Sequence, residues 1–183
     1  MVDHFQTGVN FQGKLLVAHP NLTGFFSRTI ILIYQDDPKN GISGLVLNKP
    51  TQVTVKQIVE DRGFGYDGTE HMYKGGPLND QAILMVHEDQ WYSENTMQIG
   101  NGLSITSDNL MIEKMSMNNT PRQWRMSLGM AGWHPGQLQK ELASKNGWLT
   151  CDASCAIVFD KDGERQWNKA VQECANQKID SYF

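Results

Sequence analysis

The residues best suited to chemistry gather around Trp133. The stretch AGWHPGQLQKEL, residues 131–142, combines an indole, an imidazole, a carboxamide and a carboxylate. Pro135 is typical of a first helical position, so a short helix should follow. Gln137 and Glu141 are four residues apart and therefore share one face of that helix. Such a pair can contact a ligand or hydrogen-bond the backbone of a neighbouring loop, and the sequence leaves both roles open.

Other polar residues and glycines stand at strand ends and turns, where binding residues are often found. Together with Trp133, Gln137 and Glu141, the candidate binding residues are Arg28, Asn48, Lys49, Gly75 and Gly76. Spacing alone assigns no nucleophile, base and orienting group, so no catalytic residue is predicted. An enzyme would require Glu141 to meet Arg28 or His87 in a cleft.

Three motifs of known enzymes are matched only in part. Residues 63–68 fit the dinucleotide pattern GxGxxG, but a helix precedes them and a strand follows, which reverses the required order. Ser43 lacks the second outer glycine of a nucleophile elbow. Trp91 occupies the place where HEDQW would need the second histidine of a zinc protease. The sequence therefore predicts no cofactor.

The cysteines, Cys151, Cys155 and Cys174, are three in number and lie late in the chain. An odd number in a chain without a recognisable signal peptide suggests reduced thiols rather than a disulfide framework. Structural zinc usually takes four ligands. His134 or Cys174 could approach the other two cysteines, but no paired ligand set completes a site. No metal is predicted.

Length and composition are typical of one compact domain. The chain has 183 residues, of which 39% are hydrophobic and 20% charged. The net charge is −4, and the basic residues form no block along the sequence, which argues against a nucleic-acid partner. The apolar runs are too short to span a bilayer. Together with the missing signal peptide, this predicts a cytoplasmic protein with no membrane partner.

The pattern of elements predicts an α+β fold with a mainly antiparallel sheet. DDPKNG should join strands 28–35 and 42–48 as an antiparallel hairpin. Residues 75–77 are expected to form a turn between two further strands, and Ser107 to cap helix 108–116. Other expected strands are 14–19, 102–106, 123–133, 148–151 and 156–160, and other expected helices are 54–61, one after Trp133 that stops at Asn146, and 164–175.

Five segments follow one another along the chain: GKLLVAHP, FFSRTIILI, GISGLVLNKP, YKGGPL and LGMAGWHPGQLQKEL. With these segments in this order, the chain resembles the AlgH/YqgE family of bacterial proteins from about Gly13 to about Val171. His134 departs from the family pattern, as do Met130 and Gln139, so the resemblance offers His134 no catalytic role. The family signature is met by Gly132, Trp133, Pro135, Gly136, Gln137, Leu138 and Glu141.

The resemblance implies a barrel-like, bifurcated antiparallel sheet surrounded by helices. It implies a single domain over residues 1–183, with a core at about 13–171 and short extensions. Some members are named as regulators of alginate production and transcription, which implies a regulatory role but no catalytic residue.

We therefore expect a non-enzymatic regulatory or binding protein whose partner is an unknown small molecule or protein. One alternative is a direct DNA-binding regulator. A helix-turn-helix, however, needs two adjacent helices, and every predicted helix lies between strands or at the chain end. The other alternative is an enzyme with a polar site near Glu141, Arg28 and His87.

Overall fold

The computed structural model describes residues 8–181, which form ten strands and five helices. The strands are β1 (Lys14–Ala18), β2 (Ile30–Asp37), β3 (Gly41–Val46), β4 (Pro50–Thr54), β5 (His71–Lys74), β6 (Leu78–Glu88), β7 (Met97–Gly100), β8 (Leu103–Thr106), β9 (Trp124–Trp133) and β10 (Trp148–Asp152). The helices are α1 (Val55–Asp61), α2 (Asn109–Ser116), α3 (Gln137–Leu142), α4 (Cys155–Val158) and α5 (Gly163–Asp180).

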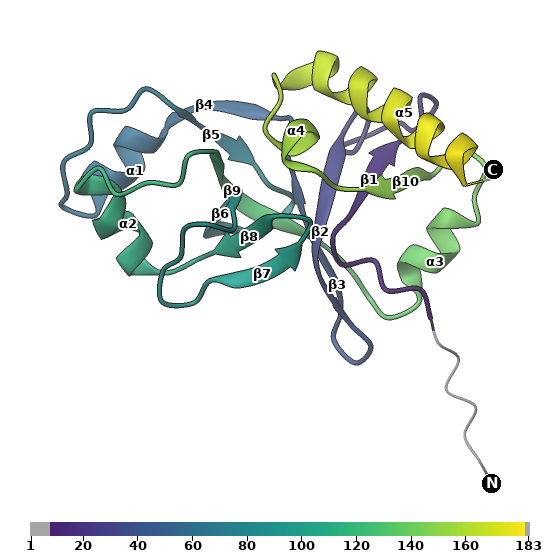
Figure 1. Cartoon of the computed structure of the whole chain (residues 1–183), viewed down its shortest axis with the longest axis horizontal. Coiled ribbons are helices and arrows are strands. Elements are labelled where there is room, and N and C mark those ends of the chain that lie inside the picture. Colours follow the sequence, from purple (N-terminus) through teal and green to yellow (C-terminus); the bar gives the residue numbers. More distant parts are fainter. Residues whose placement is uncertain (1–7, 182–183) are drawn as a thin grey trace, which may run out of the picture.

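The strands form one curled sheet in the order β10-β1-β2-β3-β9-β6-β8-β7, and the pair β4-β5 branches from β9. All pairs are antiparallel except β5 with β9, which is parallel. Figure 1 shows α1 and α2 at one end of the molecule and α3 and α5 at the other. The structure thus confirms the predicted α+β fold with a mainly antiparallel, barrel-like sheet, including the 28–48 hairpin.

Most residues of β1, β2 and β3 are buried on both faces of the sheet, which explains the mostly apolar sequences of these strands. Successive side chains of a strand point to opposite faces, so neighbours enter different cores. Leu15 and Leu32 pack in a cluster with α4 and α5, whereas Leu16 and Ile31 pack in a second cluster with Phe11 and α3. A helix on each face therefore brackets this part of the sheet.

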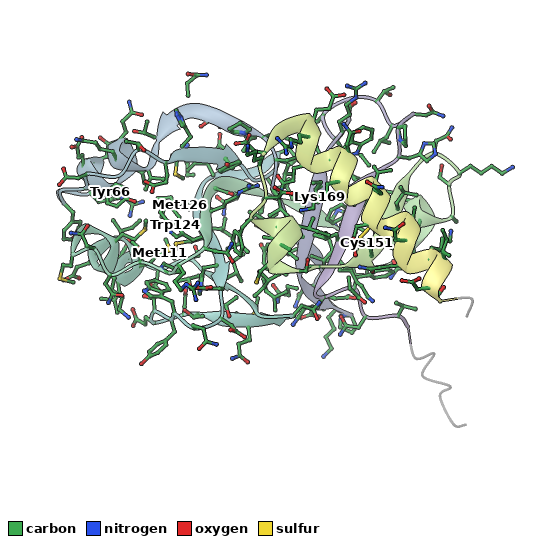
Figure 2. All side chains as sticks on the ribbon, turned by 45° about the horizontal axis from the view of Figure 1, so that its top comes forward. Tyr66, Met111, Trp124, Met126, Cys151 and Lys169 are labelled. Carbon is green, nitrogen blue, oxygen red and sulfur yellow. A yellow bond between two sulfur atoms is a disulfide. The ribbon has the colours of Figure 1, made fainter. Side chains whose placement is uncertain are left out.

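A third core fills the other half of the molecule, between α1, α2 and the strands β5, β6 and β9. Figure 2 shows Tyr66, Met111, Trp124 and Met126 gathered there. The helix α1 begins with a capping box, since the Thr54 hydroxyl accepts from Gln57 N at 3.2 Å and Gln57 Oε1 accepts from Thr54 N at 2.8 Å.

The residues Gly75 and Gly76 do not form the expected hairpin turn, because β5 and β6 do not pair with each other but lie on opposite sides of β9. The chain crosses β9 at these glycines. A Cβ on Gly75 would lie 2.3 Å from Gly129 O, and one on Gly76 would lie 2.0 Å from the carbonyl carbon of Met130. Only glycine permits so close a backbone crossing.

Several local predictions are wrong. Residues 156–160 do not form a strand, since residues 156–158 are the last three of the four-residue helix α4; a short apolar run fits a buried helix as well as a strand. Asp108, not Ser107, caps α2 and accepts from Met111 N at 2.7 Å. The strand β4 was not predicted; it begins at Pro50, a position that needs no N–H donor. The short strand β7 was missed.

The prediction of three reduced thiols is also wrong, because a disulfide joins Cys151 of β10 to Cys174 of α5. The two cysteines are 23 residues apart in sequence but face each other where α5 packs on the sheet edge. Cys155 remains a free thiol. Among the helices of residues 8–181, none is long and apolar enough to cross a lipid bilayer.

We expect the double variant Cys151→Ala/Cys174→Ala to lose about 2–4 kcal/mol of unfolding free energy, since the disulfide restricts the unfolded chain. Urea unfolding with and without a phosphine reductant measures this loss. The reductant should lower the stability of the wild type and of the control Cys155→Ser, but not that of the double variant. Equal stability of oxidised wild type and double variant would contradict the expectation.

Candidate functional site

The predicted residues around α3 form one hydrogen-bonded corner. Glu141 Oε2 accepts from the indole N–H of Trp133 at 3.0 Å and from that of Trp148 at 2.9 Å. Glu141 Oε1 accepts from Gln137 Nε2 at 3.0 Å, and Gln137 Oε1 accepts from His134 N at 3.0 Å. The carboxylate therefore holds two tryptophans, from β9 and β10, against α3. Gln137 therefore hydrogen-bonds the backbone of His134, and Glu141 hydrogen-bonds neighbouring side chains. Of the two roles that the sequence left open, these contacts correspond to the structural one.

The predicted residues Arg28, Asn48 and Lys49 lie in a different place, beside the start of α5. Asn48 is buried and fully engaged: Oδ1 accepts from Ile30 N at 2.9 Å, and Nδ2 donates to Arg28 O at 2.8 Å and Gly163 O at 3.1 Å. Arg28 pairs with Glu164, and Lys49 donates to Phe25 O. These contacts tie the loop before β2 to the end of β3 and to α5.

The three residues of the predicted enzyme site are not brought together. Arg28 is paired with Glu164, Glu141 is bound in the α3 corner, and His87 lies inside the half that contains α1 and α2. Gly75 and Gly76 are buried in the fork of β9, where Gly75 N donates to Leu128 O and Gly75 O accepts from Val46 N, both at 2.8 Å. That these residues bind a partner remains a prediction.

The imidazole of His87 is fully buried and closes a chain of hydrogen bonds. Nδ1 lies 2.8 Å from Glu88 O, a carbonyl that only accepts, so Nδ1 carries the proton. Nε2 then accepts from Thr106 Oγ1 at 2.9 Å, and this hydroxyl accepts from Thr96 Oγ1 at 2.7 Å. Burial lowers the pKa of His87. The neutral ring is thus a structural member of the core.

A buried arginine, which sequence reasoning did not select, fastens the loop before α5 to β9. Arg125 donates to Leu47 O at 2.7 Å, to Gln166 Oε1 at 2.8 Å and to Asp160 O. Its guanidinium lies over the ring of Tyr73, and the Tyr73 hydroxyl donates to Asp162 at 2.9 Å. Burial raises the pKa of Tyr73 to about 12. The hydrogen-bonding groups of Arg125 and Tyr73 are therefore engaged within the protein.

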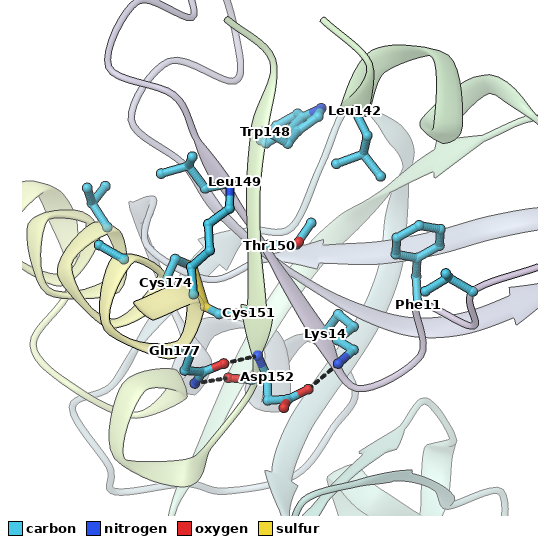
Figure 3. A pocket seen from close by; sticks show the side chains of 14 residues that line it. Phe11, Lys14, Leu142, Trp148, Leu149, Thr150, Cys151, Asp152, Cys174 and Gln177 are labelled. Carbon is cyan, nitrogen blue, oxygen red and sulfur yellow. Dashed lines mark hydrogen bonds and ion pairs between the residues drawn. A yellow bond between two sulfur atoms is a disulfide. The ribbon is translucent and has the colours of Figure 1, made fainter. Parts of the chain in front are cut away.

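A concave site, a groove of about 680 Å³, runs along β10 and is shown in Figure 3. The strand β10 lies between α5 on one side and Phe11 with Leu142 of α3 on the other. Its volume lies within the range of ordinary ligand sites. The lining residues are Val9, Phe11, Lys14, Leu142, Trp148, Leu149, Thr150, Cys151, Asp152, Val171, Cys174, Ala175, Gln177 and Lys178.

The strand in this groove has a free edge, because β10 ends the sheet and, among residues 8–181, pairs with β1 alone. Asp152 N donates to Gln177 Oε1 at 2.8 Å, whereas Ala153 N points the other way and donates to Gly13 O at 3.0 Å. Backbone directions alternate along an antiparallel strand. The N–H and C=O groups of Thr150 therefore face the groove, and no residue between 8 and 181 hydrogen-bonds to them.

The chemistry of the groove is mainly apolar, with a small basic excess at one end. Its charged side chains are Lys14, Lys178 and Asp152. Lys14 forms an ion pair with Asp152, and Lys178 has no ion-pair partner among residues 8–181. Both lining cysteines are joined in the disulfide, so neither supplies a thiolate nucleophile or metal ligand there.

The predicted residues do support this site indirectly. Glu141 fixes Trp148, and α3 places Leu142 on one wall of the groove. The residues that line the other wall were not predicted to bind, because they become neighbours of β10 only after α5 packs on the sheet. The stripe of Val171 and Cys174 on α5 is the one sequence signal that points to this contact.

The family model described as AlgH-like matches residues 15–178 of the chain. A UPF0301 protein of Shewanella oneidensis is 32% identical over 169 residues, which cover 88% of this chain and 89% of that protein. A UPF0301 protein of Xanthomonas oryzae is 32% identical over 163 residues, which cover 86% of each.

Two solved structures share the fold. The solution structure of the AlgH protein from Pseudomonas aeruginosa superposes with a TM-score of 0.75 at 26% identity and covers 94% of this chain and 92% of that one. A crystal structure of a protein from Corynebacterium diphtheriae gives a TM-score of 0.73 at 24% identity, covering 90% and 87%.

We expect Glu141→Gln to lower the unfolding free energy by about 1–3 kcal/mol. The carboxylate accepts hydrogen bonds from three N–H donors, and the NH₂ group of the new side chain would face at least one of them without accepting its hydrogen bond. Urea unfolding followed by tryptophan fluorescence measures the change. Glu113→Gln, at an exposed site on α2, is the matched control and should unfold like the wild type. Coinciding curves for all three proteins would show that the corner contributes nothing.

We expect stability to fall with pH below about 6.5 in part through His87. Its folded pKa lies below that of an unfolded histidine, so the unfolded chain binds more protons as the pH drops through that range. Unfolding free energies at pH 7.5 and 5.5 should differ less in His87→Gln than in the wild type. The exposed-site variant His134→Gln controls for the loss of one histidine; an unchanged slope in His87→Gln would refute the assignment.

Proposed function

The chain belongs to the AlgH-like family, and we propose that it is a non-catalytic binding protein whose partner site is the groove along β10. The free edge of Thr150 within an apolar groove is the observation that carries this proposal. The edge of a sheet with unpaired N–H and C=O groups readily binds another chain unless it is covered.

The titratable groups of the groove favour binding over catalysis. Lys14 and Asp152 neutralise each other, and Lys178 has no ion-pair partner within the described range 8–181. A catalytic site needs a nucleophile or proton-transfer group positioned by neighbours, and these side chains offer no such set. The apolar side chains Phe11, Leu142 and Trp148 instead provide area for contact.

The same features favour a protein partner over DNA as the means of the regulation that the family resemblance implies. One lysine in excess is a weak attraction for a phosphate backbone, whose binding needs several basic contacts. A surface that combines apolar side chains with a free strand edge suits polypeptide better.

We expect a photo-crosslinking amino acid at Ala175, inside the groove, to capture a discrete partner in cells of the native host. The same amino acid at Gln172 is the matched control, because Gln172 is also exposed on α5 but does not line the groove. Mass spectrometry of the adducts reads a protein or a small molecule. Equal adducts at both positions, or none at Ala175, would contradict the proposal.

A further inference from the structure

We infer that the occupant of the groove is an extended segment of a partner protein that adds to the sheet as a strand beside β10, with an acidic side chain at Lys178. This inference rests on the proposed function and names the kind of partner. It follows from the backbone at the groove floor, from the two apolar walls and from the charge at one end.

The backbone of β10 already shows the pairing that an added strand would make. The carboxamide of Gln177 donates to Asp152 O at 3.5 Å and accepts from Asp152 N at 2.8 Å. A side-chain amide thus takes the place of a peptide group of a neighbouring strand at Asp152. At Thr150, two residues before Asp152 on the same strand, the backbone N–H and C=O groups point the same way and have no hydrogen-bond partner among residues 8–181. A strand that ends beside Gln177 would complete the row.

The walls accept side chains on both sides of such a strand. Leu149 lies on the side of α5, whereas Thr150 lies on the side of Phe11 (Figure 3). Val171 and Ala175 of α5 also line the groove. Side chains of an added strand alternate between these two walls. Both walls are apolar, so the segment should carry a short continuous apolar run. The five residues of β10 set its length at about 17 Å.

The charge of the groove sets the polarity of its partner. Lys178 follows Gln177 on α5 and lines the groove. Its ammonium group is unpaired among residues 8–181, although the whole chain carries a net charge of −4. An acidic side chain beside the apolar run would pair with it.

A second copy of the chain fits this site less well than a separate segment. Self-pairing would place two β10 strands edge to edge by a two-fold axis, with the same surface on both sides. Each β10 lies at the floor of a groove between α5 and the Phe11 side, so two such concave faces oppose each other. A protruding single segment reaches the floor of the groove.

The test begins with a display library of random decapeptides selected on the full chain. We expect recovered peptides to share an apolar run with an adjacent Asp or Glu, and one synthesised peptide to slow the amide exchange of Thr150 by at least about tenfold. Thr150→Pro removes the free N–H without breaking a bond to β1, since proline is tolerated at an outward position of an edge strand. It should weaken peptide binding about tenfold.

Matched variants make these results specific. Thr150→Val keeps the N–H and should bind within about twofold of the wild type. Lys178→Glu should weaken the acidic peptide about tenfold, whereas Lys161→Glu, an equal charge change outside the groove, should leave binding unchanged. Circular dichroism and unfolding curves establish that each variant is folded.

Several results would overturn the inference. They are failure to recover any peptide, unchanged Thr150 exchange in the complex, or wild-type binding by folded Thr150→Pro. A concentration-dependent dimer abolished by Thr150→Pro would assign the edge to a second copy instead. If the crosslinker at Ala175 still captures a partner in cells, these results refute only the strand addition, and the groove remains the binding site. If crosslinking at Ala175 and peptide binding both fail, the proposed function is refuted as well.

Discussion

The close passage of Gly75 and Gly76 across β9 is the constraint on which the rest of the structure depends. At this crossing the backbone atoms leave no space for a Cβ on either glycine. The crossing lets β5 and β3 lie on one side of β9 and β6 on the other. The strand β9 is therefore shared by both halves of the molecule, and the three cores are joined through one backbone.

Two networks then set the walls of the groove from opposite sides of the sheet. Arg125 reaches from β9 to Asp160 and Gln166, and so holds the start of α5. The disulfide holds α5 to β10 further along. On the other face, Glu141 draws Trp133 and Trp148 toward α3. Residues that the sequence suggested as ligand contacts, such as Trp133 and Glu141, thus hydrogen-bond within the protein. The groove is lined mainly by apolar side chains instead.

The elements that could be predicted are those whose pattern is local. The runs that became β1, β2 and β3 are mostly apolar, and the stripe of Trp167, Val171 and Cys174 marks α5. The shared helical face of Gln137 and Glu141 was predictable from their spacing, whereas the hydrogen bonds from the two indoles to Glu141 were not. In contrast, the four-residue α4 lies in a run that suits either helix or strand. The role of Gly75, the disulfide and the groove depends on contacts between distant segments, which spacing does not encode.

The fork at β9 also constrains the order in which the chain can complete its fold. The strands β3, β5 and β6 all precede β9 in the chain, and each pairs with it. A ribosome releases them first, so the nascent chain carries three strands whose β9-facing edges lack a partner until residues 124–133 emerge. Unpaired edges promote aggregation during folding. Emergence of this one strand satisfies all three at once, and a chain stalled before it is the form most in need of a chaperone.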